Sequence, residues 1–341
     1  MKNDKLGICL IGAGRAGMIH ANNFMKRVPN ACMKCVVDVV PETARSAAES
    51  LGISRYCVDY REILDSPGID AVVVVSPTHL HREIVVACAG AGKHILCEKP
   101  MALNAQECEE MENAVARNNV KLQIGFMRRF DADFIRAKEI VDSGTIGEVV
   151  LIRSCTRGPS KPHPWMYDLK RSNGILAEVN SHDIDTIRWF ADSEVKTVFA
   201  VAGNYRNREI AAEFPDYYDN IVVTGEFVNG IQYVIDGAAY MRYGYDVKLE
   251  IIGTFGTVRV SREEANRVQC VTPENGINTP FVKSWTDLFK DAYLEEDVQF
   301  VDCILNDKEP QVTGHDGKMA VQIVEAGNRS VAEKRIIEFT G

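Results

Sequence analysis

The residues best suited to do chemistry begin with a glycine-rich stretch near the start of the chain. It reads Gly12-Ala13-Gly14-Arg15-Ala16-Gly17, a GxGxxG pattern between an apolar run and a helical stretch. In such a loop the first glycine permits a tight turn, the second lets the backbone approach a pyrophosphate, and the third lets helix and strand pack closely. Amide groups at the helix N-terminus then face the anion. The pattern predicts a dinucleotide site, and a glycine turn without a ligand is the alternative.

An acidic residue after the second apolar run distinguishes between the two nicotinamide dinucleotides. Asp38 directly follows Cys35–Val37, where it is placed to accept a hydrogen bond from a ribose 2′-hydroxyl. Its charge would repel the 2′-phosphate of NADP, and the next residues, Val39 and Val40, supply no cation. We therefore expect NAD as the cofactor and NADP to be less favoured.

A second set of chemically useful side chains lies further along the chain. Glu178, His182 and Asp185 fall at positions i, i+4 and i+7, so the spacing predicts that they share one face of a helix. Two general interpretations of such a face remain open. Histidine and carboxylates could bind a metal ion, or the face could simply be solvated.

The apolar patterns predict the elements that position these residues. Up to about Gly125, short runs that are apolar throughout alternate with helical stretches, which is typical of a parallel sheet buried on both faces. The predicted strands are 6–11, 35–37, 71–75, 94–97 and 120–124, and the predicted helices are 16–28, 41–51, 81–91 and 105–118. Ligands of such doubly wound α/β sheets bind at the carboxyl ends of the strands.

The pattern changes in the second part of the chain. Longer strands, many of them alternating apolar and polar residues, are predicted at 149–156, 195–202, 221–228, 231–236, 247–252 and 257–260, with helices at 131–143, 286–305 and 316–333. Asn229-Gly230 predicts a type I′ hairpin turn. We expect a Rossmann NAD-binding domain over residues 1–125. An α+β domain with a large, mostly antiparallel open sheet should follow over residues 126–341, for substrate binding and oligomerisation.

Composition excludes several classes of function. The chain has 341 residues, of which 46% are hydrophobic and 26% charged, as expected for a globular protein of two domains. Its 39 basic and 48 acidic residues give a formal charge of −9, so nucleic acid is not an expected partner. No apolar run approaches the roughly 20 residues of a membrane helix, and no secretory signal is recognisable. We expect a cytoplasmic protein with no membrane partner, whose ten cysteines are reduced.

Three further stretches resemble the Gfo/Idh/MocA oxidoreductases, the family of glucose–fructose oxidoreductase and inositol dehydrogenase. The glycine loop continues as Met18-Ile19-His20-Ala21, the fourth strand ends in Ser76-Pro77-Thr78-His79-Leu80-His81, and the fifth ends in Glu98-Lys99-Pro100. Segments 125–131 and 243–246 extend the resemblance into the second domain. The resemblance implies that the cofactor pocket includes Ser76, Pro77, Thr78, His81, Glu98 and Lys99 in addition to the glycine loop and Asp38. A metal pair formed by His79 and His81 is the alternative for those two residues.

The resemblance also implies the catalytic residues. In the family, a carboxylate and a histidine in an Asp-x-x-x-His-x-x-Asp pattern join the lysine of Glu-Lys-Pro in the active site. By that match Lys99, His182 and Glu178 are the expected catalytic residues, and no metal is expected. Alcohol oxidation releases a hydride and a proton, and either Lys99 or His182 could be the formal base. The chain has Glu178 where the family usually has Asp, so this carboxylate reaches one methylene further.

The expected substrate is a cyclitol, sugar or glycoside with a secondary hydroxyl. Its expected contacts are Lys99, Arg129, Trp165, Glu178, His182, Asp185 and Tyr243. An inositol 2-dehydrogenase and a sugar or glycoside 3-dehydrogenase both satisfy these expectations. The alternatives are a glycosidase with an internal NAD redox cycle and a non-catalytic dinucleotide-binding regulator. We also expect a homo-oligomer, either a dimer or a homotetramer.

Overall fold

The structure is a computed structural model that describes residues 5–261, 264–265, 268–274 and 276–339. The chain divides into two units, Met1–Phe130 with Asp291–Val321 and Asp131–Lys290 with Gln322–Gly341. Residues 291–321 thus belong to the first unit, whereas the sequence-based division assigns everything after residue 125 to the second domain. The reason is helix α10 (Lys290–Leu305), which buries Phe300 and Val301 in the core of the first unit.

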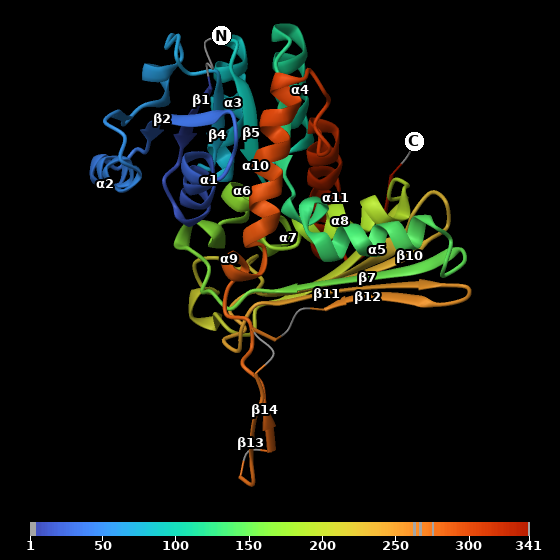
Figure 1. Cartoon of the computed structure of the whole chain (residues 1–341). Coiled ribbons are helices and arrows are strands. Elements are labelled where there is room, and N and C mark those ends of the chain that lie inside the picture. The colour runs from blue at the N-terminus through green and yellow to red at the C-terminus, as the bar shows by residue number, and fades with distance from the viewer. Residues whose placement is uncertain (1–4, 262–263, 266–267, 275, 340–341) are drawn as a thin grey trace. The chain divides into compact units, whose positions relative to one another are not determined.

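The first unit contains a six-stranded, wholly parallel sheet, as predicted. Every residue of β1 and β4 is buried, because helices cover both faces of the sheet (Figure 1). The strands are β1 (Leu6–Ile11), β2 (Ala31–Val37), β3 (Tyr56–Cys57), β4 (Ala71–Val74), β5 (His94–Glu98) and β6 (Leu122–Gly125). The connecting helices are α1 (Arg15–Lys26), α2 (Pro41–Leu51), α3 (His81–Gly90) and α4 (Ala105–Asn118).

The strand order of this sheet locates its ligand-binding edge. The order is β3-β2-β1-β4-β5-β6, so the direction of strand addition reverses between β1 and β4. Ligands of doubly wound sheets bind in the crevice outside the carboxyl ends of the strands at such a reversal. The glycine loop follows β1 and the predicted segment 76–81 follows β4, so the two flank this point.

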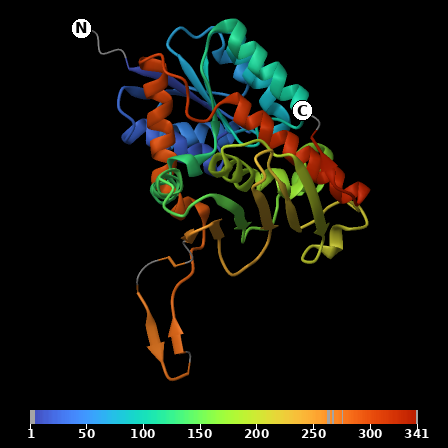
Figure 2. The same cartoon turned by 90° about the vertical axis from the view of Figure 1, so that its right-hand side faces the viewer.

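The second unit contains a seven-stranded, mostly antiparallel sheet, which also agrees with the prediction. The strand order is β12-β11-β7-β10-β9-β8-β15, and β7 pairs with β10 in parallel. Helices α5 (Ala132–Asp142) and α8 (Ser181–Ala191) lie along one face (Figures 1 and 2). The strands are β7 (Val149–Arg157), β8 (Thr197–Gly203), β9 (Asn220–Glu226), β10 (Gln232–Ala238), β11 (Asp246–Gly253), β12 (Thr257–Ser261) and β15 (Ile337–Glu338).

The remaining α-helices and strands are short, apart from one long helix. They are α6 (Leu169–Ser172), α7 (Gly174–Glu178), α9 (Trp285–Leu288) and α11 (Gly314–Glu333), with a separate two-stranded sheet of β13 (Cys270–Thr272) and β14 (Gly276–Asn278). Within the described part of the chain, no helix combines the length and the apolar character needed to cross a membrane.

Two local predictions are wrong in detail. The β9–β10 hairpin exists, but Asn229 does not have the positive φ of a type I′ turn. The amide of Gly230, whose φ is +86°, donates to the carbonyl of Phe227. This is a type I turn followed by a left-handed glycine.

The helix predicted over 286–305 is broken at Phe289. The side chain of Phe289 turns into the core, where its ring centroid lies 6.3 Å from that of Phe134.

Candidate active site

The glycine loop forms the turn from β1 into α1. Gly12 has a φ of +100°, and a Cβ atom there would lie 2.6 Å from the carbonyl oxygen of Val75. A Cβ atom on Gly17 would lie 2.0 Å from the carbonyl oxygen of Gly12. The turn and the strand–helix contact therefore require these two glycines, which is the requirement that the sequence pattern predicts.

Gly14, the middle glycine, differs from the other two. It is the N-cap residue of α1, and its φ of −72° suits any residue. A Cβ atom on Gly14 would meet no atom within 4 Å, so the packing of the protein itself does not require glycine here. Open space in front of a helix N-terminus is what the close approach of a pyrophosphate needs.

Asp38 lies at the end of β2, beside this loop. Its Oδ2 accepts a hydrogen bond from the amide of Ala13 at 2.9 Å, and its Oδ1 accepts one from the amide of Val40 at 3.0 Å. The carboxylate is therefore held against the loop, while the side chains of Val39 and Val40 are exposed. This is the position that the sequence predicts for a carboxylate that binds ribose.

The turn after β4 contains three of the predicted cofactor residues. Pro77 is exposed and Thr78 is buried. The hydroxyl oxygen of Ser76 is buried and has no hydrogen-bond partner among the described residues. A buried polar atom without a partner is uncommon in folded proteins, so this hydroxyl is available to a bound group.

His81 connects two turns at this edge of the sheet. Its ring nitrogens lie 2.7 Å from the carbonyl oxygen of Ser76 and 2.9 Å from that of Pro100. Burial lowers the pKa of His81, so the ring is neutral at pH 7 and one nitrogen donates. The ring therefore lies between the turns after β4 and β5, and it donates a hydrogen bond to one of these two carbonyls.

The Glu-Lys-Pro motif follows β5 at the same edge of the sheet. Glu98 is the last residue of β5 and is buried, and Lys99 is half-buried. The Oε2 atom of Glu98 accepts a hydrogen bond from the backbone amide of Lys99 at 3.0 Å. Glu98 is thus occupied in fixing the turn that carries Lys99.

The predicted catalytic residues are divided between the two units. Lys99 belongs to the first unit, and Glu178 and His182 belong to the second. Glu178 and His182 lie on different helices, which corrects the prediction that one helix presents Glu178, His182 and Asp185 on a shared face. Helix α7 ends at Glu178, and α8 begins at Ser181.

The break between α7 and α8 has a local cause. The amides of Val179 and Asn180 both donate to the carbonyl of Ile175, which closes α7. Asn180 then takes the N-cap position of α8, with its side-chain amide donating to the carboxylate of Asp183 at 2.8 Å. Asparagine is favoured at helix N-caps, so the sequence contained a signal for this boundary.

Asp183 is a buried acid next to His182 that the sequence analysis did not identify. It is completely inaccessible to solvent, and the hydroxyl of Ser154 on β7 donates to its Oδ1 at 2.5 Å. Together with the contact from Asn180, this fixes the first turn of α8 to the sheet. His182 and Asp185 are also buried, on the same helix.

The predicted substrate residues outside these helices have varied surroundings. Arg129 is buried in the first unit, where its guanidinium pairs with Asp316 at 2.9 Å. Tyr243 is exposed in the second unit, and its hydroxyl donates to Asp246 at 2.9 Å. Trp165 is half-buried in a short 3₁₀ turn. Their roles toward a substrate stay predictions.

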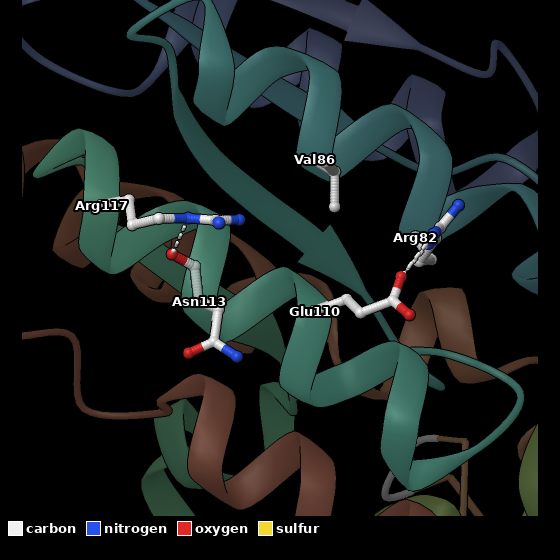
Figure 3. Close-up of a pocket in the computed structure, with 5 residues that line it drawn as sticks. All are labelled: Arg82, Val86, Glu110, Asn113 and Arg117. Atoms are coloured by element: carbon white, nitrogen blue, oxygen red, sulfur yellow. Dashed lines mark hydrogen bonds and ion pairs between the residues drawn. The ribbon is translucent and has the colours of Figure 1, made fainter.

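A hollow elsewhere in the first unit is separate from these residues. It has a volume of about 450 Å³ and lies between α3 and α4 (Figure 3). Its lining residues are Arg82, Val86, Glu110, Asn113 and Arg117, and Arg82 and Glu110 form an ion pair across it. None of the predicted site residues lines this hollow.

The residues at the carboxyl edge of the first sheet fit a bound dinucleotide. The space in front of Gly14 matches the pyrophosphate, Asp38 matches the ribose, and the buried Ser76 hydroxyl offers a further polar contact. When bound, the nicotinamide of such a cofactor accepts a hydride.

Comparison with known proteins agrees with this geometry. Residues 6–126 match the family profile described as "Oxidoreductase family, NAD-binding Rossmann fold", and residues 134–259 match "GFO/IDH/MocA C-terminal domain". A myo-inositol 2-dehydrogenase of Thermotoga maritima is 34% identical, over 97% of this chain and 98% of that protein. A scyllo-inositol 2-dehydrogenase (NAD(+)) of Bacillus subtilis is 32% identical, over 94% of this chain and 92% of that protein.

A solved structure is similar over the same extent. The scyllo-inositol dehydrogenase of Lactobacillus casei, crystallised with bound NAD(H) and scyllo-inositol, superimposes with a TM-score of 0.88 at 29% identity. The match covers 98% of this chain and 99% of that chain. The family profiles, the related sequences and the solved structure all match both units of the chain, and they indicate the family that the sequence motifs predict. The chain belongs to the Gfo/Idh/MocA family of oxidoreductases and carries that family's NAD-binding Rossmann fold.

Proposed function

We propose that the protein is an NAD-dependent dehydrogenase that oxidises one secondary hydroxyl of an inositol to the ketone. The reaction converts the alcohol and NAD⁺ into the ketone, NADH and a proton. The observation that carries the proposal is the full-length similarity to inositol 2-dehydrogenases and to a scyllo-inositol dehydrogenase that was crystallised with NAD(H) and scyllo-inositol. The second candidate is a sugar or glycoside 3-dehydrogenase. Glu178 favours it, because this carboxylate is one methylene longer than the Asp that the family usually has there.

The protein's own residues would handle the proton and the oxygen. His182 would exchange the hydroxyl proton, Lys99 would stabilise the developing charge on the oxygen, and Glu178 would orient a neighbouring hydroxyl. Lys99 suits this role because it follows β5 at the edge where ligands of doubly wound sheets bind. Direct proton abstraction by Lys99 is the other assignment, and pH–rate profiles of single variants at Lys99 and His182 would separate the two.

Asp38 supports NAD as the cofactor in preference to NADP. Both of its carboxylate oxygens accept backbone hydrogen bonds, which keeps the charge beside the glycine loop. A 2′-phosphate would meet this charge, and the adjacent side chains of Val39 and Val40 are apolar and exposed. The cofactor preference therefore rests on one carboxylate and on the lack of a cation at the two following positions.

We also propose that the protein forms a homo-oligomer through the sheet of the second unit. Val201 on β8 and Val222 on β9 are partners in the antiparallel ladder, and they are 60% and 43% exposed. These two valines are an apolar part of the exposed sheet face, and a contiguous apolar face of this kind is stabilised when another subunit covers it. Light scattering of the wild type and of a Val201→Glu variant tests this. The molar mass of the particles in solution should be lower for the variant, because its subunits should separate.

A panel of substrates tests the proposed reaction. NADH absorbance should rise at about pH 9 with NAD and either myo-inositol or scyllo-inositol, and less with glucose or simple glycosides. NADP should give a much lower rate. If no substrate of the panel produced NADH although NAD were tightly bound, the proposal of a dehydrogenase would be contradicted. It would instead favour a glycosidase with an internal redox cycle or a dinucleotide-binding regulator.

A further inference from the structure

A buried chain of side chains connects helix α10 to the Glu-Lys-Pro turn. His20 on α1 is completely inaccessible to solvent and lies between two carboxylates. Its Nδ1 lies 2.6 Å from Oδ1 of Asp297 on α10, and its Nε2 lies 3.2 Å from Oε1 of Glu98. The other oxygen of Asp297 accepts a hydrogen bond from the amide of Asn23 at 2.8 Å. All of these residues belong to the first unit.

The charge state of this chain follows from its geometry. Each ring nitrogen of His20 faces a carboxylate oxygen, so each nitrogen donates when the ring carries two protons. Burial alone would lower the pKa of His20, but Asp297 and Glu98 together hold it well above its usual range. We assign the proton to His20, although burial also raises the pKa of Asp297. The imidazolium is thus held from both sides by charge-assisted hydrogen bonds.

Glu98 is confined on a further side by the backbone. A Cβ atom on Gly125, at the end of β6, would lie 3.0 Å from both Cδ and Oε2 of Glu98. The carboxylate therefore fits into the space that this glycine leaves. Its Oε2 accepts the backbone amide of Lys99, while its Oε1 faces His20. Any shift of the carboxylate would be passed directly to the backbone of Lys99.

We propose that His20 is a positioning residue for Lys99. Helix α10 fixes His20 through Asp297, His20 fixes the carboxylate of Glu98, and Glu98 fixes the backbone from which the Lys99 side chain extends. The inference rests on the proposed role of Lys99 in the reaction. It adds that the position of Lys99 depends on helix α10, which comes later in the sequence. The contact that links this helix to α1 joins residues 277 positions apart, His20 and Asp297.

Three variants test the proposal. His20→Gln removes the positive charge and one of the two contacts. Asp297→Asn keeps the side-chain volume but removes the negative charge, so it serves if His20→Gln does not fold. His94→Gln is the matched control, because His94 is at the opposite end of β5 and its ring nitrogen only accepts the amide of Lys121 at 3.0 Å.

The expected result is a division between turnover and cofactor binding. In His20→Gln and Asp297→Asn, kcat should fall on the order of 10- to 100-fold, since a displacement of about 1 Å at a catalytic group has effects of that size. The Kd for NAD should rise much less than kcat falls, because the glycine loop and Asp38 are untouched and only the Glu98–Lys99 part of the predicted cofactor pocket is displaced. His94→Gln should retain the wild-type kcat. A parallel loss of NAD affinity and kcat would indicate general damage and overturn the proposal.

A double-mutant cycle separates this inference from the proposed function. If His20 acts through Lys99, His20→Gln should lower the residual rate of a Lys99→Ala protein by less than about twofold. Multiplicative losses would overturn the inference and leave Lys99 as a catalytic residue. Normal turnover of Lys99→Ala would instead refute the proposed role of Lys99, on which this inference rests, and would leave the dehydrogenase itself in place. A crystal structure of His20→Gln gives a result that does not depend on activity. Displaced Glu98 and Lys99 support the inference, and unchanged positions overturn it.

Discussion

The amide of Ala13 in the glycine loop donates a hydrogen bond to Oδ2 of Asp38 at 2.9 Å. This contact joins the turn after β1 to the end of β2, so the group that would face the pyrophosphate and the group that would face the ribose are held as one structure. The first sheet presents both at its carboxyl edge, beside the reversal of strand order between β1 and β4.

Replacing Asp38 by Asn should change the preference between the two dinucleotides. Asn keeps the size of the side chain and an oxygen that can accept the Ala13 amide, but it removes the charge. We expect kcat/KM for NAD to fall about tenfold, as for the loss of a hydrogen bond to a charged group. The value for NADP should rise, because the repulsion of its 2′-phosphate is gone. An unchanged ratio of the two kcat/KM values would show that Asp38 does not select the cofactor.

Two glycine variants of the loop should behave in opposite ways. Gly14→Ala should lose no more than about 1 kcal/mol in the free energy of unfolding, because its Cβ meets no atom and the cost is limited to the poorer helix N-cap that alanine makes. It should nevertheless bind NAD at least about tenfold more weakly, because the methyl group occupies the space for the pyrophosphate. Calorimetric titration with NAD and urea unfolding measure the two quantities.

Gly17→Ala is the counterpart of that variant. Its Cβ would lie 2.0 Å from the carbonyl oxygen of Gly12, so α1 must move away from β1. We expect the free energy of unfolding to fall by about 1–3 kcal/mol or more, the usual cost of overpacking. Equal stability of the Gly14 and Gly17 variants would contradict the distinction between a glycine required by packing and one required by the ligand.

Asp183 should contribute to stability through the start of α8. Asp183→Ala removes the acceptor of two buried hydrogen bonds and leaves the Ser154 hydroxyl and the Asn180 amide unsatisfied. The expected loss in the free energy of unfolding is about 2–4 kcal/mol. Ser154→Ala removes only one donor and should cost about 1 kcal/mol. Urea unfolding compares them, and a smaller loss in Asp183→Ala than in Ser154→Ala would refute this role.

The buried imidazolium should make stability depend on pH. The folded pKa of His20 lies above the value of about 6.5 of an unfolded chain, so protonation stabilises the folded state. That contribution is fully present below about pH 6.5 and is lost as the pH rises through the folded pKa. The stability advantage of the wild type over His20→Gln should therefore shrink in thermal unfolding as the pH is raised above about 6.5. Glu98, Asp297 and Glu296 all face His20, so an advantage that grows with pH would place the proton elsewhere.

Much of the first unit could be predicted from the sequence because its signals are local. Strands buried on both faces read as unbroken apolar runs, so β1 is predicted residue for residue and β4 and β5 within one residue. The glycine loop and Asp38 follow from the spacing of a single strand–helix–strand unit. These predictions depend on neighbours within a few tens of residues. The strands are confirmed, and the roles of the glycine loop and Asp38 toward a cofactor stay predictions.

The rest depends on contacts that spacing does not encode. His20 on α1 pairs with Asp297 on α10, although the two residues are 277 positions apart in the sequence. No local pattern marks either residue as a partner. The break between α7 and α8 was marked only by Asn180, which a continuous i, i+4 pattern of polar residues outweighed. The first case is a long-range contact and the second a local helix boundary, and the spacing of the polar residues encodes neither.

Transfer of deuterium from an inositol deuterated on its ring carbons to NAD tests the central proposal most directly. The proposed function predicts NADH that carries one deuterium by mass spectrometry with the wild type, and at least about a hundredfold less of it with Lys99→Ala at unchanged NAD affinity. His94→Gln should match the wild type. Unlabelled NADH, no NADH, or equal labelling by the Lys99→Ala protein would contradict the account.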